Sequence, residues 1–178
     1  MAYCPPKTPA TGCLDVIIQE SIILPNFNRQ QSYNEFTVCG INNYVTRTEI
    51  IDSRWSGSGI GIIDFVGSPS EQTPGSFVNS DVKYIRITNI PTSPTFASIY
   101  IIKTNKESAL FKIEPGRSLV LSSDEFDASS TADYVDETYA DKQYFDDFLY
   151  MSEIKAKAGD TNGTFTGSIK IEYVVASA

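Results

Sequence analysis

Histidine is missing from this 178-residue chain, and cysteine is scarce, at three residues. The absence of histidine removes the commonest general base, the Ser-His-Asp and Cys-His arrangements, and most transition-metal sites. Cys4, Cys13 and Cys39 are odd in number and show no C-x-x-C spacing. We therefore expect neither a disulfide framework nor a zinc site, and we interpret Cys39 as a small buried hydrophobic residue.

Long apolar runs and positive charge are also lacking. No run approaches the roughly 20 residues needed to cross a bilayer, and the first residues lack the charged and apolar regions of a signal peptide. The formal net charge is −8, whereas nucleic acids and anionic membranes bind basic patches. We expect no nucleic-acid partner, no membrane partner and no Sec export.

The sequence does contain many short runs rich in β-branched and aromatic residues, bounded by Pro, Gly, Asn or Ser. This pattern is typical of antiparallel strands joined by tight turns. It is clearest in Asp81–Leu121, where Pro91 and Pro94 interrupt one pair of runs and Pro115-Gly116 marks the next reversal. Neither face of the first of these runs is cleanly polar, so we expect that strand inside a sheet covered on both sides.

Two hairpins are predicted at the ends of the chain. Leu14–Leu24 reads as a first strand, and Asn42-Asn43 is expected to form a two-residue turn between further strands at Tyr33–Ile41 and Tyr44–Asp52. At the other end, Tyr150–Ala158 and Thr164–Val175 are expected to form a closing hairpin. In its last strand, apolar residues alternate with mostly polar ones, which predicts a half-buried strand.

The glycines Gly57, Gly59 and Gly61 superficially resemble a dinucleotide-binding loop. Their spacing is G-x-G-x-G, and a β-rich run follows them where such a loop requires a helix. We interpret them as a flexible strand entry or as points of close backbone approach.

These patterns predict an all-β fold, an antiparallel β-sandwich or jelly-roll. Residues 1–13 are expected to form a Pro-rich, extended N-terminal arm, either frayed or docked on a neighbouring subunit. Residues 14–178 form a single β-sandwich domain, interrupted by an acidic-aromatic insertion at 122–149 that we expect to be a long loop.

The insertion offers the only concentration of possible metal ligands. Carboxylates suit calcium, but no EF-hand spacing is present, and acidic runs usually face water. We predict no catalytic residue, no cofactor and no resident metal, with calcium left open. The calcium candidates are Asp124, Glu125, Asp127, Asp133, Asp136 and Glu137.

Several strand segments resemble a known group of proteins. Val82–Ile90, Ile99–Lys103 and Phe111–Leu119, together with Ile154–Gly159 and Gly167–Val175, are similar in strand-and-turn style to small β-sandwich structural proteins of tailed bacteriophages. The resemblance covers roughly the second half of the chain. It implies a virion component present in many copies, made in the host cytoplasm.

We therefore expect a non-enzymatic capsid decoration (cement) subunit that stabilises the particle, with itself and the major capsid protein as partners. A tail or neck component remains open. So does a carbohydrate- or receptor-binding module that uses Trp55, while a carboxylate glycosidase is disfavoured. The expected interface residues lie in the arm and the insertion: Tyr3, Pro5, Pro6, Phe126, Tyr134, Tyr139, Tyr144 and Phe145.

Overall fold

The computed structural model describes residues 11–22, 30–53, 59–106, 108–122, 148–159 and 167–178. These residues form strands and short 3-10 turns, with no α-helix among them. The prediction of an all-β chain is confirmed. None of the described elements is a helix long and apolar enough to span a membrane.

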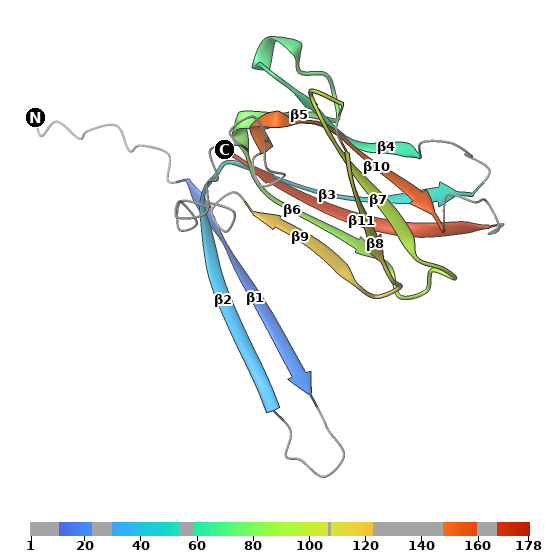
Figure 1. Ribbon diagram of the computed structural model, residues 1–178. Helices are drawn as coiled ribbons and strands as arrows, with labels where there is room; N and C mark the ends of the chain where they lie inside the picture. Colours follow the sequence, from blue (N-terminus) through green and yellow to red (C-terminus); the bar gives the residue numbers. More distant parts are fainter. Residues whose placement is uncertain (1–10, 23–29, 54–58, 107, 123–147, 160–166) are drawn as a thin grey trace, which may run out of the picture.

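Two sheets, which we call the body, contain nine of the strands (Figure 1). Every neighbouring pair in the body is antiparallel except the first pair of the five-stranded sheet, which is parallel. The five-stranded sheet has the order β5 (Ser76–Val78), β4 (Ile60–Val66), β10 (Met151–Ala158), β7 (Ala97–Lys103) and β8 (Ser108–Ile113). The four-stranded sheet has the order β3 (Asn43–Asp52), β11 (Ser168–Ser177), β6 (Val82–Asn89) and β9 (Ser118–Ser122).

One hydrophobic core fills the space between the two sheets. It is built by the period-two alternation of the strands, because every second side chain points to the same face. The central strands contribute pairs of isoleucines that are fully buried, and each such side chain contributes about 1.5–3 kcal/mol of transfer free energy. These pairs are Ile85 and Ile87, Ile99 and Ile101, and Ile169 and Ile171.

The strands predicted within Asp81–Leu121 are present as β6, β7, β8 and β9. These four strands do not all pair with the next strand in the chain. β7 pairs with β8, whereas β6 pairs with β9. The two connections with proline, after β6 and after β8, therefore carry the chain from one sheet to the other. β6 lies between β11 and β9, which confirms an interior strand.

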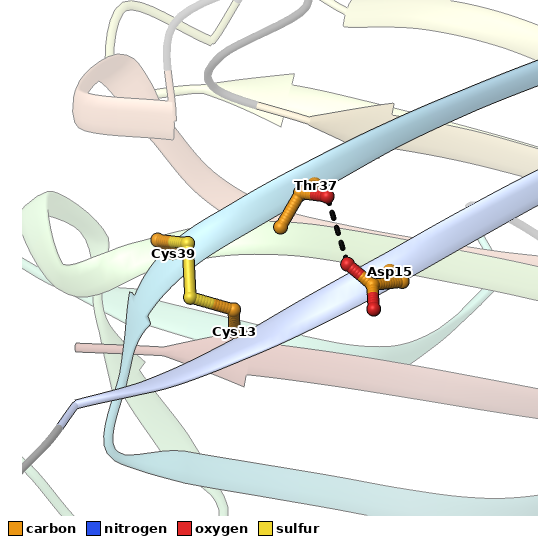
Figure 2. Close-up of a disulfide and its surroundings, with 4 residues drawn as sticks. All are labelled: Cys13, Asp15, Thr37 and Cys39. Atoms are coloured by element: carbon orange, nitrogen blue, oxygen red, sulfur yellow. Dashed lines mark hydrogen bonds between the residues drawn. A yellow bond between two sulfur atoms is a disulfide. The ribbon is translucent and has the colours of Figure 1, made fainter.

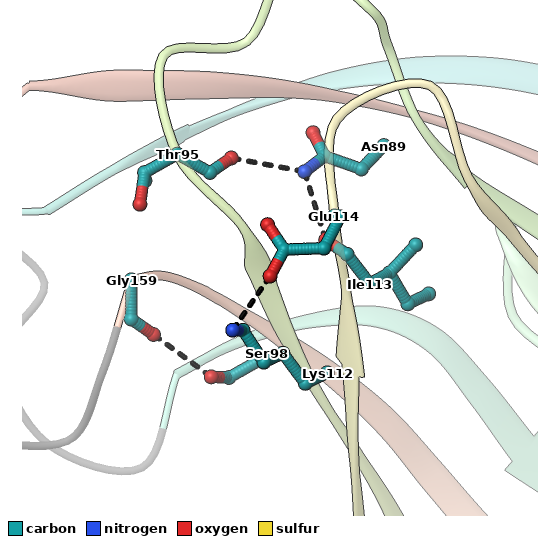
Figure 3. A network of polar contacts seen from close by, with 7 residues as sticks. All are labelled: Asn89, Thr95, Ser98, Lys112, Ile113, Glu114 and Gly159. Carbon is teal, nitrogen blue, oxygen red and sulfur yellow. Dashed lines mark hydrogen bonds and ion pairs between the residues drawn. The ribbon is translucent and has the colours of Figure 1, made fainter.

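Asn89, the last residue of β6, ties both of these connections together (Figure 3). Its side-chain amide nitrogen donates to the carbonyl oxygens of Thr95 and Ile113, at 3.0 Å each. Its backbone carbonyl accepts from the Gly116 amide at 2.7 Å. Gly116 has a φ of 77°, as the turn predicted at Pro115-Gly116 requires. One buried amide thus fixes where the chain crosses between the sheets.

The predicted closing hairpin is wrong. β10 and β11 are both strands, but β10 lies between β4 and β7 in one sheet, and β11 lies between β3 and β6 in the other. The two strands belong to different sheets, and they are not hydrogen-bonded neighbours. Alternation identifies the buried face of a strand, and it gives no information on which strand lies beside it. The turn expected at 159–163 lies largely outside the described residues.

The predicted Asn42-Asn43 hairpin is also wrong. The strand before it pairs with the first strand of the chain, and β3 pairs with β11. The only non-glycine residue with positive φ in the described part of the chain is Lys106, so neither asparagine adopts the conformation that the turn demands. The positive φ instead occurs at Gly40, at 81°, where the register of β1 and β2 shifts by a β-bulge. The Asn42 amide then donates to the Ser177 carbonyl at 2.9 Å.

A third sheet consists of two strands, β1 (Gly12–Ile22) and β2 (Gln30–Ile41), and we call it the ribbon. The ribbon leaves the body at one end and extends away from it (Figure 1). β1 confirms the predicted first strand, and it includes the last two residues of the range predicted as an arm. Residues 1–10 of that arm lie outside the described residues.

Two smaller predictions can be compared with the structure. Gly59 has a φ of 84°, and a Cβ there would lie 2.9 Å from the Ala156 carbonyl oxygen, which confirms a close backbone approach. In β11, Lys170 is exposed and Glu172 is half-buried, as expected of a half-buried strand, but Val174 is buried. The outer face of this strand is therefore covered near its end.

The role of Asn89 can be tested by Asn89→Ala. The substitution would leave two carbonyl oxygens without their amide donor in a buried site, where each loss costs about 1–3 kcal/mol. We expect the free energy of unfolding to fall by about 2–4 kcal/mol, measured by urea denaturation. Thr92→Ala, at an exposed position in the same connection, should change it by less than about 0.5 kcal/mol. Equal effects of the two variants would contradict this role.

Candidate interaction site

The ribbon is the element of the described structure whose shape most needs an explanation. An isolated pair of strands is marginally stable in water, because it has no second layer on which to bury a face. Here the two strands run to 11 and 12 residues, longer than any strand of the body. Something must therefore stabilise the ribbon, and the structure shows two such interactions at its base.

The first is a disulfide between Cys13 and Cys39 (Figure 2). The two residues are directly opposite in the register, with their Cα atoms 4.1 Å apart, close to the spacing of non-hydrogen-bonded antiparallel pairs. Beside it the Thr37 hydroxyl donates to Asp15 Oδ1 at 2.8 Å. The expectation of no disulfide was wrong, and Cys39 is exposed, not buried. Pairing across 26 residues cannot be deduced from cysteine spacing.

The second is a small hydrophobic cluster between the ribbon and the outer face of the four-stranded sheet. Val38 of β2 is fully buried there, and on the body Tyr84, Val174 and Ala176 are each at most 5% exposed. This contact explains why the outer face of β11 is buried near its end. The partly buried residues packed against the cluster are Leu14, Val16, Phe36, Ile41 and Val120.

Beyond its base the ribbon carries apolar side chains that nothing in the described structure covers. Ile18, on the same face as Val16, is 39% exposed, and Ile17, on the opposite face, is 56% exposed. Tyr33 is 61% exposed, and its hydroxyl donates to Glu35 at 2.9 Å. Single exposed apolar residues are ordinary, but here they gather on both faces of one projecting element. This arrangement suits a segment that becomes buried against another molecule.

The charge on the ribbon is of one sign. Among its described side chains, Asp15 and Glu35 are acidic and none is basic. The pKa of Tyr33 is raised by its hydrogen bond to Glu35, by slight desolvation and by the negative charge of that carboxylate. Burial raises the pKa of Tyr84 at the ribbon's base, partly opposed by Arg86. Both phenols are therefore neutral at physiological pH.

A shallow groove lies at the β3 side of the body. It has a volume of about 500 Å³, and it lies between the first half of β3 and the segment 69–77. Arg47 is its one charged lining residue. Next to it, burial raises the pKa of Tyr173, and the Arg47 guanidinium opposes that shift. Arg47 also hydrogen-bonds to Tyr173, and the carboxylates of Glu49 and Asp64 lie close enough to raise the pKa of that phenol. The groove can therefore bind a polar group.

The site residues predicted from the sequence lie outside the residues that the structure describes. All six calcium candidates and all eight expected interface residues lie in segments 1–10 and 123–147, outside the described residues, and so does Trp55. Within the described part of the chain, no three His, Cys, Asp or Glu residues come together as metal ligands. The exposed residues of the ribbon were missed. A signal for them exists in 14–18, where Ile17 stands on the otherwise polar face of an amphipathic strand.

The disulfide can be tested in the intact protein. Closing a loop of this length contributes about 3 kcal/mol in the chain-entropy model, so reduction should make the ribbon amides exchange with solvent much faster. The amides of β6 and β11 should keep their protection, because the core does not involve the disulfide. Hydrogen-exchange mass spectrometry measures both regions at once. Peptide mapping without reductant should recover Cys13 linked to Cys39, and finding both as free thiols would refute the assignment.

Comparison with protein-family models, curated proteins and solved structures finds no match to this chain.

Proposed function

We propose that this chain is a non-enzymatic structural subunit that assembles with further copies of itself through the ribbon. The observation that carries the proposal is the exposed apolar surface beyond the ribbon's base, at Ile17, Ile18 and Tyr33. A projecting pair of strands gains stability when a neighbouring subunit supplies the second layer that it lacks. Removal of such surface from water contributes about 25 cal/mol per Å².

The body suits a structural role. We infer that it is a β-sandwich, because two sheets share one core that is made from the inner faces of both. The disulfide supports a location outside the reducing cytosol, since disulfides persist at virion and cell surfaces and are rare in cytosolic proteins.

The specific setting follows from the resemblance of the strand segments to virion proteins of tailed bacteriophages. In that setting the chain is a capsid decoration subunit on the particle surface, with the major capsid protein as a further partner. A tail or neck component is the alternative within the same class. The carbohydrate- or receptor-binding alternative depends on Trp55, which lies outside the described residues.

The proposal is tested by replacing Ile17 and Ile18 together with serine. The double variant should retain the melting temperature of the body, because neither side chain belongs to a core cluster. It should assemble to a lower mass than the parent protein, measured by light scattering over a concentration series. Leu110→Ser is the matched control, since Leu110 is 57% exposed on the body, and it should leave the mass unchanged.

A parent protein that is monomeric at every concentration, or a ribbon variant that assembles as the parent does, would overturn the proposal. The same measurement with a chelator tests whether the acidic-aromatic insertion at 122–149 binds calcium. A loss of mass on chelation would mean that calcium at this segment stabilises the assembly. Quenching of tryptophan fluorescence by a glycan would instead favour the ligand-binding module.

A further inference from the structure

The outer edge of the four-stranded sheet, formed by β3, has no strand beside it in the described structure. Soluble proteins usually protect such edges with short strands, Pro, Lys or bulges. β3 has ten residues, contains neither Pro nor Lys, and pairs with β11 without a register shift. The other edge strands of the body, β5, β8 and β9, have three, six and five residues. Among the described edge strands of the body, β3 is thus the longest, and it lacks Pro, Lys and bulges.

The hydrogen bonds just beyond the strand ends show which groups on β3 face outward. The Ser53 amide donates to the carbonyl of Gly167, which lies directly opposite in the β3–β11 register, at 2.8 Å. On the other side of β11, the Ile90 amide donates to the Lys170 carbonyl at 3.0 Å. Backbone groups alternate in direction along a strand. The odd-numbered residues of β3 therefore bond to β11, and Tyr44, Thr46, Thr48 and Ile50 present their amides and carbonyls to the free edge.

The side chains of β3 are self-complementary about Thr48. If a second copy of β3 pairs antiparallel with the first so that Thr48 lies opposite Thr48, each Arg47 lies opposite a Glu49. In the same register Thr46 faces Ile50 and Val45 faces Ile51, which are favourable cross-strand pairs of β-branched residues. Moving the centre by one residue would place two copies of Arg47, or two of Glu49, directly opposite each other.

Charged residues at a sheet edge normally discourage pairing. Here there is one of each sign, two residues apart, so a two-fold partner would place a charge of opposite sign beside each, with Arg47 also hydrogen-bonded to Tyr173 of its own chain. The register centred on Thr48 also matches the outward direction of the backbone groups of Thr46, Thr48 and Ile50. The backbone direction requires an even-numbered centre, and the charge order favours Thr48 among these.

We propose that β3 is a homodimer interface, in which the edges of two copies pair antiparallel about a two-fold axis at Thr48 and join their four-stranded sheets. The occupant is a second copy of this chain. This contact is separate from the ribbon and does not depend on the function proposed above.

The experiment uses the full chain with Cys4 replaced by serine and a single new cysteine, either Thr48→Cys or Thr46→Cys. In the proposed register the two positions at residue 48 have Cα atoms about 5.5 Å apart, which a disulfide can span. The two positions at residue 46 lie about 14 Å apart, since they are offset by four residues. We expect oxidation to give a cross-linked dimer with Thr48→Cys on a non-reducing gel, and at least ten-fold less with Thr46→Cys.

Equal cross-linking of the two variants would mean random collision and would overturn the proposal, as would no cross-linking of a folded Thr48→Cys variant. A second measurement needs no new cysteine. Arg47→Glu should raise the dimer dissociation constant by ten-fold or more in sedimentation, and adding Glu49→Arg should restore it. Repeating the cross-link with Ile17 and Ile18 replaced by serine separates the two contacts, because the β3 dimer should persist when ribbon assembly is lost.

Discussion

The packing of the ribbon's base on the outer face of the four-stranded sheet is the contact on which the rest of the architecture depends. That sheet is apolar on both faces at one end, because β11 has Tyr173 and Val175 on the inner face and Val174 and Ala176 on the outer face. The outer face of a sheet in a two-layer protein normally lies in water. Apolar side chains such as Val174 and Ala176 on that face need to be covered. Val38 and its neighbours on the ribbon cover that outer face. The same contact anchors a ribbon that would be marginal alone.

The anchoring is local, and this explains the shape of the molecule. The disulfide and the buried Val38 both lie near the point where the ribbon meets the body, and exposure increases from Val16 to Ile18. The distal part of the ribbon is held in place by its own ladder and by whatever it contacts. The base of the ribbon is therefore anchored to the body, and its far end is uncovered. This is the arrangement expected of an element that docks on a neighbour.

The sequence predicted the strands well and their partners poorly, for a physical reason. Alternation in 168–177 reflects burial of one face, and this depends only on the position of the core. Pairing depends on which strands share hydrogen bonds, and no residue in β10 or β11 encodes that choice locally. Asn42-Asn43 has the composition of a turn, yet the tertiary demand for β3 beside β11 overrode it. Gly40, which has the positive φ at the β-bulge, looks in the sequence like any other glycine in a strand.

The site was predicted less well than the fold. An odd number of cysteines argued against a disulfide, although two of three can still pair with each other. The exposure of Ile17 was not predicted, because the strand that contains it resembles a core strand in sequence.

The two proposed contacts have different geometric consequences. In an antiparallel β3 pair, the two copies of Asn43 lie about 34 Å apart, since they are offset by ten residues. Each ribbon joins its body next to Asn43, so the two ribbons of a dimer would leave from opposite ends of the joined sheets. In this arrangement a ribbon that begins there would contact a third subunit, not the two-fold partner. An isologous contact at the edge combined with a projecting contact at each end extends an assembly beyond the dimer, as a protein that covers a large surface requires.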